Sequence, residues 1–174
     1  MNAKLIAALL GFVMLFTVSA RAGSRKAITS NRDLGPLGKL VGMWLASGDM
    51  NRDGKPEPFI ITYKLTCGGT ALIETIMPGT GREMVTVYTR EGSGFQLTHY
   101  CTLGNQPRML ARNTDGKKLE FEFLDATGMN AADDAHMHSH TIEIIDPDHV
   151  LETWNFWEKS RLKSEEVFKL TREK

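Results

Sequence analysis

The sequence lacks the features that mark several large classes of protein. It contains only two cysteines, Cys67 and Cys101, and its 21 basic and 21 acidic residues leave no net charge at neutral pH. A balanced charge gives no electrostatic footprint for nucleic acid or for an anionic membrane surface. The Gly-x-Ser-x-Gly pattern is also absent, which removes the commonest signature of a serine hydrolase.

Long apolar runs are also scarce, and the longest lies close to the N-terminus. It extends from Leu5 to Val18 and is shorter than the roughly 20 residues that span a bilayer as a helix. Lys4 precedes it, and the small-x-small motif that ends at Ala22 follows it. This pattern predicts a signal peptide over residues 1–22 and a secreted or periplasmic protein, with a short membrane anchor as the alternative. We expect a flexible leader over residues 23–33.

The rest of the chain shows short segments in which apolar and polar residues alternate, separated by Gly, Pro, Asn and Asp. This pattern predicts an all-β domain over residues 34–172, with a short helix at 32–39. About ten strands are expected, at residues 40–48, 59–66, 71–77, 83–90, 95–102, 108–113, 118–125, 136–145, 150–157 and 162–171.

The predicted turns alternate in length, as in an antiparallel up-and-down barrel whose two ends differ. Compact turns at 67–69, 91–94, 115–117 and 146–148 would lie at one end. Longer loops at 49–58, 78–82, 104–107 and 126–135 would form a mouth at the other end. Since Cys67 would lie at the tight end and Cys101 at the mouth, we predict two unpaired thiols.

Several runs of residues resemble a known family. Leu37 to Trp44 is similar to the Gly-x-Trp entry of lipocalin-like barrels, and together with residues 98–101, 104–109, 136–138 and 146–149 it resembles secreted bacterial lipocalin-like proteins of unknown function. The resemblance implies a calycin-type barrel, distantly nitrobindin-like, and implies no known reaction. A nitrobindin-like barrel would suggest haem on a single histidine, but no position here matches that ligand.

Three histidines alternate along one predicted strand, at His136, His138 and His140. Alternate strand residues share a face, so the three imidazoles would lie beside one another and could bind zinc or copper. His99 could supply a further metal ligand from another strand, and Asp133 or Asp134 a carboxylate. The alternative is that one histidine is exposed and the others form hydrogen bonds inside the barrel. A β-bulge near Ser139 would break the shared face.

Further candidate binding residues lie near the predicted mouth. His99 shares its parity with apolar neighbours and should point inward, and Cys101 is either a soft ligand, a nucleophile or a buried structural thiol. Asn105, Gln106 and Arg108 could close over a polar ligand, with Arg108 as the charged anchor. Alternatively, amide hydrogen bonds hold this segment as a simple turn.

The sequence therefore predicts a barrel that binds a small hydrophobic or amphiphilic ligand at its loop-rich end. The polar head group would be oriented by His99, Arg108 and the histidines of residues 136–140. A metal-dependent enzyme that uses the His-x-His-x-His set is one alternative. A non-catalytic barrel that acts through a protein partner is the other. For the aromatic rings of the segment Trp154 to Trp157, core packing is the default expectation, and one ring could line the ligand cavity.

Overall fold

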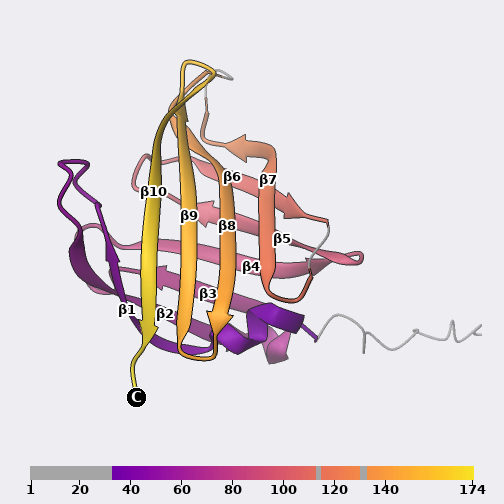
Figure 1. Ribbon diagram of the computed structural model, residues 1–174. Helices are drawn as coiled ribbons and strands as arrows, with labels where there is room; N and C mark the ends of the chain where they lie inside the picture. Colours follow the sequence, from indigo (N-terminus) through magenta and orange to yellow (C-terminus); the bar gives the residue numbers. More distant parts are fainter. Residues whose placement is uncertain (1–32, 113–114, 130–132) are drawn as a thin grey trace, which may run out of the picture.

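Ten antiparallel strands form a closed barrel in the computed structural model, which describes residues 33–112, 115–129 and 133–174 (Figure 1). Each strand pairs with the next along the chain, and the first and last strands pair to close the barrel. The strands are β1 (Gly42–Gly48), β2 (Glu57–Thr66), β3 (Ala71–Ile76), β4 (Met84–Glu91), β5 (Gly94–Tyr100), β6 (Gln106–Ala111), β7 (Lys118–Thr127), β8 (His136–Asp146), β9 (His149–Glu158) and β10 (Arg161–Arg172). The predicted all-β, antiparallel up-and-down barrel is confirmed. The predicted signal peptide lies outside the described residues.

Alternation between buried and exposed side chains explains why these segments form strands. In β7, Leu119 and Phe121 are buried, whereas Glu120 and Glu122 are exposed. Successive side chains of a strand point to opposite faces, so this pattern buries one face of each strand inside the barrel. Apolar side chains from all around the barrel meet there and form one hydrophobic core.

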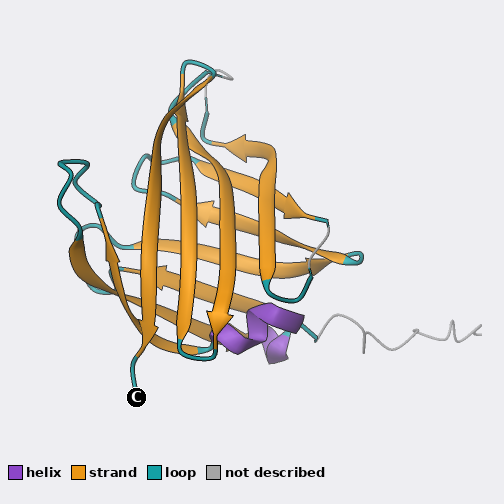
Figure 2. Cartoon of the chain, viewed as in Figure 1, coloured by secondary structure: helices purple, strands orange, loops and turns teal. Residues whose placement is uncertain are grey.

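Helical structure is confined to short 3₁₀ segments among the described residues (Figure 2). The first, η1 (Gly35–Leu40), begins later than the helix expected at 32–39, and β1 begins at Gly42. Gly35 has a positive φ of 51° and is followed by Pro36, so the chain turns sharply before the helical segment begins. Leu37 and Leu40 of η1 are fully buried and close the base of the barrel. The second, η2 (Cys67–Gly69), is a turn between β2 and β3.

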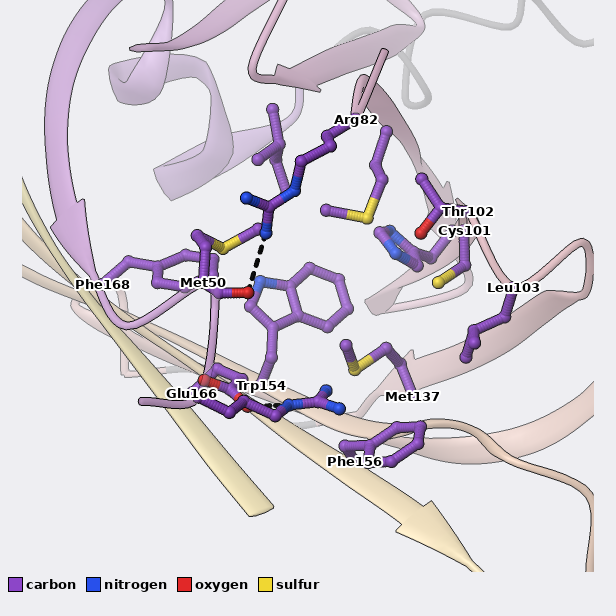
Figure 3. Close-up of a pocket in the computed structure, with 14 residues that line it drawn as sticks. Met50, Arg82, Cys101, Thr102, Leu103, Met137, Trp154, Phe156, Glu166 and Phe168 are labelled. Carbon is purple, nitrogen blue, oxygen red and sulfur yellow. Dashed lines mark hydrogen bonds and ion pairs between the residues drawn. The ribbon is translucent and has the colours of Figure 1, made fainter. Parts of the chain in front are cut away.

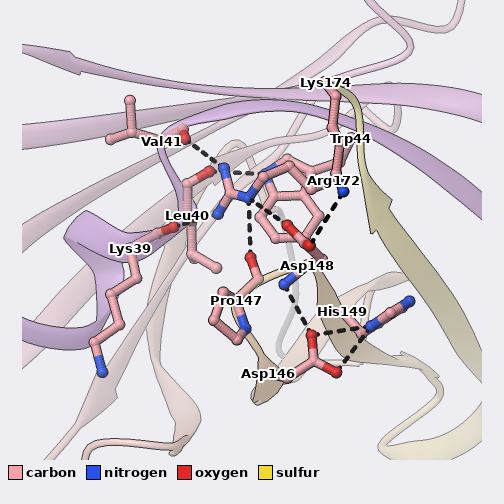
Figure 4. Close-up of polar contacts among 10 residues, drawn as sticks. All are labelled: Lys39, Leu40, Val41, Trp44, Asp146, Pro147, Asp148, His149, Arg172 and Lys174. Carbon is pink, nitrogen blue, oxygen red and sulfur yellow. Dashed lines mark hydrogen bonds and ion pairs between the residues drawn. The ribbon is translucent and has the colours of Figure 1, made fainter.

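Arg172 contacts several elements at the base of the barrel, where β10 pairs with β1 (Figure 4). Its guanidinium lies over the Trp44 ring, 4.1 Å from the ring centroid, and donates hydrogen bonds to the carbonyls of Lys39, Val41 and Pro147 at 2.6, 2.8 and 2.9 Å. The Trp44 indole donates a hydrogen bond to the Leu40 carbonyl at 2.7 Å. These contacts join η1, both closing strands and the turn between β8 and β9.

The two ends of the barrel differ as the turn lengths predict. The turns after β2, β4, β6 and β8 lie at the end that η1 covers, whereas the loops after β1, β3, β5 and β7 lie at the opposite end. The two-residue turn after β9 also lies at the loop-rich end. Cys67 and Cys101 are both free, which confirms the prediction of two unpaired thiols.

Candidate functional site

A cavity of about 210 Å³ lies inside the loop-rich end of the barrel (Figure 3). Three aromatic side chains contribute to its walls, namely Trp154 and Phe156 of β9 and Phe168 of β10. Trp154 and Phe156 therefore line the cavity, whereas core packing was the default expectation for this segment. Ile76 and Leu103 add aliphatic surface, so most of the wall is apolar.

Sulfur atoms form a second part of the wall. Met50, Met84, Met137 and Cys101 all line the cavity. Figure 3 shows the side chains of Met50, Cys101 and Met137 arranged around the indole of Trp154. The sequence analysis placed Cys101 at the mouth, as observed, but it did not single out the methionines.

His99 supplies a polar nitrogen to this mostly apolar cavity. The side chain is 1% exposed, and its Nδ1 lies 2.9 Å from the hydroxyl of Thr86 on the neighbouring strand. No hydrogen-bond partner for Nε2 exists among the described residues. Burial lowers the pKa of His99 to about 4, so the imidazole is neutral at pH 7.

The proton of the neutral His99 imidazole lies on either Nδ1 or Nε2. In the tautomer with the proton on Nδ1, that nitrogen donates to the Thr86 hydroxyl, and the lone pair of Nε2 can accept a hydrogen bond or coordinate a metal.

Two arginines from different loops stand at the rim of the cavity. Arg52 forms an ion pair with Glu166 of β10 at 2.6 Å, and its guanidinium lies over Phe156. Arg82 donates hydrogen bonds to the carbonyl of Met50 and to the side chain of Asn51, at 2.7 and 2.9 Å. It thereby holds the loop between β1 and β2 across the mouth. Among the described residues, Arg82 forms no ion pair with an acidic side chain.

A polar network lies in the barrel interior next to the cavity. The hydroxyl of Tyr63 contacts Glu74 at 3.1 Å and also contacts Glu152, while the hydroxyl of Tyr88 contacts Glu74 at 2.8 Å and Nε2 of His140 at 3.2 Å. Nδ1 of His140 lies 3.2 Å from the carbonyl of Thr153 and donates to it. The rings of His99 and His140 both pack against Trp154, which connects the network to the cavity wall.

Burial shifts the two glutamates of this network toward their neutral form. Burial raises the pKa of Glu74 and of Glu152, and the charge of Glu74 raises the pKa of Glu152 further. No arginine or lysine is buried among the described residues, so nothing nearby offsets a carboxylate charge. Burial also lowers the pKa of His140, which keeps that imidazole neutral.

The prediction that His136, His138 and His140 share one face is wrong. The pairing of β8 with β9 shifts by one residue between Met137 and Ser139, so His138 is the extra residue of a β-bulge. Met137 consequently lines the cavity, and His140 points into the interior network. His136 and His138 lie neither in the wall of the cavity nor in the interior network.

His136 and His138 form a separate aromatic cluster. His138 stacks on Trp157 at 3.9 Å and on Phe123 at 4.9 Å between ring centroids. Nε2 of His136 lies 2.9 Å from Nδ1 of His138, while Nδ1 of His136 lies 2.6 Å from the carbonyl of Asp134. A hydrogen bond thus joins two nitrogens that were expected to converge on a metal.

The four predicted metal ligands therefore occupy three places: His99 in the cavity, His140 in the network, and the His136–His138 pair beside Trp157. Over residues 33–112, 115–129 and 133–174, no group of three or more His, Cys, Asp or Glu side chains is placed to hold a metal ion. Whether any of these histidines binds a metal stays a prediction.

Asn105, Gln106 and Arg108 do not line the cavity. The amide of Asn105 donates to the carbonyl of Ala135 at 2.7 Å, and that of Gln106 donates to the carbonyl of Gly104 at 3.0 Å. Both contacts match the alternative expectation, in which amide hydrogen bonds hold a turn.

Arg108 is not the charged anchor of the cavity, contrary to expectation. Its Nε donates to the carboxylate of Asp125 at 2.6 Å, and both side chains are more than 40% exposed. Arg108 alternates with the buried Pro107 and Met109, so it points away from the interior.

The rim arginines Arg52 and Arg82 and the buried Glu74 and Glu152 were not among the predicted site residues. The sequence carries a signal for the glutamates but none for the arginines. Glu74 shares the parity of Leu72 and Ile76, and Glu152 shares that of Trp154, so an acidic residue at an inward position was a usable signal. Arg52 and Arg82 lie in loops, where no periodicity fixes the direction of a side chain.

Comparisons with known proteins identify neither a family nor a function for this chain. No protein-family model and no curated protein matches the chain. Among solved structures, it is similar to the crystal structure of a protein of unknown function from the DUF3598 family of Nostoc punctiforme PCC 73102, with 14% sequence identity and a TM-score of 0.43. The match covers 79% of this chain but only 48% of that protein, so this chain spans about half its length. No described helix is long and apolar enough to cross a bilayer.

Proposed function

We propose that the barrel binds a small, largely apolar molecule with an acidic head group in the cavity at its loop-rich end. One observation carries the proposal: the cavity combines an apolar wall with two buried ring nitrogens, Nε2 of His99 and Nε1 of Trp154, that have no hydrogen-bond partner among the described residues. Binding sites for small molecules have this composition, because apolar contacts provide affinity and a few polar groups fix orientation.

The size of the cavity limits the ligand. An apolar cavity of roughly 150 Å³ takes up benzene, so about 210 Å³ suits one substituted ring or a short acyl chain. A molecule that buries roughly 200 Å² of apolar surface gains about 5 kcal/mol, which corresponds to a dissociation constant on the order of 0.1 mM. Haem is larger than this volume and does not suit the cavity.

The charge at the rim favours an acidic head group. Arg52 is already neutralised by Glu166, whereas Arg82 makes hydrogen bonds only to neutral acceptors. A carboxylate at the mouth would pair with Arg82 while the apolar part of the ligand reached His99 and Trp154. Arg82 thus takes the anchoring role that the sequence analysis assigned to Arg108.

A matched pair of probes tests this proposal: 3-phenylpropanoate and its neutral analogue 3-phenylpropan-1-ol. Binding is followed by NMR through the indole N–H signals, because Trp154 lines the cavity and Trp44 lies at the opposite end. We expect both probes to shift the Trp154 signal and not the Trp44 signal, with the carboxylate bound about fivefold more tightly through one exposed ion pair.

Three variants complete the test. Arg82→Gln should remove the preference for the carboxylate, whereas Arg161→Gln, which removes an exposed charge at the same end of the barrel, should keep it. Thr102→Trp should fill the cavity from its exposed rim and abolish binding of both probes. No shift of the Trp154 signal at about 5 mM of either probe would refute the proposal.

Export of the chain is a separate proposal that rests on residues 1–22. Fusion of this segment to a periplasmic reporter enzyme should export the reporter from a bacterial host, and replacement of Leu9 and Leu10 by Arg should retain it in the cytoplasm. Retention of the unmodified fusion would contradict the proposal.

A further inference from the structure

The cavity contains an unusual number of sulfur atoms for its size. Three thioethers, from Met50, Met84 and Met137, and one thiol, from Cys101, contribute to the wall of about 210 Å³. They come from the β1–β2 loop, β4, β8 and the residue that follows β5, so their positions reflect the fold and not one local motif. Methionine is unbranched and has three rotatable side-chain bonds, so thioethers on facing walls can approach a common point.

A nitrogen ligand is available in the same cavity. His99 is fully buried, its Nδ1 lies 2.9 Å from the hydroxyl of Thr86, and its Nε2 has no partner among the described residues. A metal-binding histidine has this arrangement, in which a hydrogen bond at one ring nitrogen fixes the tautomer and orients the other.

We propose that this cavity binds a soft monovalent metal ion, Cu(I), through Nε2 of His99, the sulfur of Cys101 and the thioethers of Met84 and Met137, with Met50 above them in the loop. Thiolate and thioether ligands select Cu(I), whereas zinc in proteins takes thiolates, imidazoles and carboxylates. Coordination by Cys101 releases its thiol proton to water, so one proton appears for each ion bound.

The charge of the site also favours a monovalent ion. The rim contains Arg52, Arg82 and Glu166, which together carry one net positive charge. A Cu(I)–thiolate unit has no net charge, so the positive charge of the rim hardly opposes the binding of Cu(I). A divalent ion would keep a net positive charge next to the arginines in a buried site, where opposing charges interact strongly.

The proposal goes beyond small-molecule binding and rests on different atoms, the sulfurs, although both ligands would use Nε2 of His99. The two proposals can therefore fail independently. A shift of the Trp154 signal by 3-phenylpropanoate without Cu(I) binding would leave the proposed function standing, and the reverse result would leave the metal site standing.

The test measures Cu(I) affinity under anaerobic conditions, by competition with a coloured Cu(I) chelator, and stoichiometry by native mass spectrometry. The protein carries Cys67→Ser, because that exposed thiol at the opposite end would bind copper by itself. We expect one Cu(I) per chain and no stoichiometric Zn(II).

Methionine variants identify the ligands. Met84→Leu with Met137→Leu conserves side-chain volume and should weaken Cu(I) binding at least about tenfold, as loss of metal ligands does. The matched control, Met43→Leu with Met77→Leu, changes two methionines that do not line the cavity and should leave the affinity within about twofold. Thermal unfolding shows whether each variant is folded.

Three results would overturn the proposal. The first is equal Cu(I) affinity in the Met84/Met137 variant and its control. The second is binding that depends on Cys101 alone, measured with Cys101→Ser. The third is Zn(II) bound as tightly as Cu(I).

Discussion

His99 shows how one residue can set both a binding site and a dependence of stability on pH. Burial lowers its pKa from about 6.5 in the unfolded chain to about 4 in the fold. Between these values the unfolded chain binds more protons than the folded one. The free energy of unfolding therefore falls as the pH decreases from about 6.5 to about 4, and this one group contributes about 3 kcal/mol to the fall.

The variant His99→Phe tests this prediction, because it removes the titrating group and keeps an aromatic ring in the barrel. Urea unfolding at pH 7 and at about pH 4.5 should show that the wild-type protein loses more stability than the variant on acidification. Equal losses in the two proteins would contradict the assignment to His99.

Gly94 illustrates a different constraint at the scale of one residue. A Cβ atom placed there would lie 2.0 Å from the backbone oxygen of Ala111 on the paired strand, and backbone cannot yield as a flexible side chain can. We expect Gly94→Ala to destabilise the protein by about 3 kcal/mol or more. Gly38→Ala is the control, because nothing lies within 4 Å of the added atom and its φ is not positive. Urea unfolding curves of the two variants should differ clearly; similar curves would show that strand β6 can shift.

At the scale of the element, alternation predicted the strands well and their irregularities poorly. All ten strands lie at the expected positions to within a few residues, because inward and outward side chains differ strongly in polarity. The bulge at His138 carries no such signal, since Met137, His138 and Ser139 are all intermediate in burial. A shift of one residue moves every later side chain to the other face, so the histidine set was wrongly grouped.

Arg172 links three elements, and its replacement should affect the closure of the barrel. Arg172→Lys keeps the charge but cannot donate to the carbonyls of Lys39, Val41 and Pro147 together. We expect a loss of about 2 kcal/mol, since several hydrogen bonds from a charged donor are removed. Thermal unfolding measures it. Arg161→Lys on the same strand, at its exposed far end, should change stability by less than about 0.5 kcal/mol. If Arg172→Lys leaves the stability unchanged, a positive charge over the Trp44 ring is enough to close the barrel and the three hydrogen bonds add little.

At the scale of the whole molecule, the barrel interior contains two carboxyl groups, and their effect on the pH dependence of stability is opposite to that of His99. The raised pKa values of Glu74 and Glu152 mean that the folded protein keeps protons that the unfolded chain releases above about pH 4.5. The free energy of unfolding should therefore decrease as the pH rises from about 4.5 toward the raised values.

Replacement of both residues by glutamine should remove this dependence, because the amide has a similar shape and no charge to bury. The stability of the Glu74→Gln/Glu152→Gln protein relative to wild type should increase between about pH 5 and pH 9, as measured by urea unfolding. A constant difference over that range would mean that the carboxyl groups ionise in the fold as they do in water.

The sequence predicted less of the site than of the fold for a physical reason. His99 lies on the regular strand β5 and Cys101 directly follows it, so parity and strand direction placed both at the loop-rich end. Arg52 and Arg82 lie in loops and are positioned by hydrogen bonds to residues far apart in sequence, Glu166 of β10 and Met50 of the β1–β2 loop. Such contacts appear only when the whole barrel has assembled, and no local pattern encodes them.

The pairing of β1 with β10 has a consequence for biosynthesis. Trp44 opposes Arg172, so the two edges of the sheet cannot meet until β10 has been synthesised and has left the ribosome. A nascent chain that stops before Arg161 would retain two exposed edges and an open hydrophobic interior. A nascent chain should thus acquire resistance to proteases only after β10 is available to pair with β1.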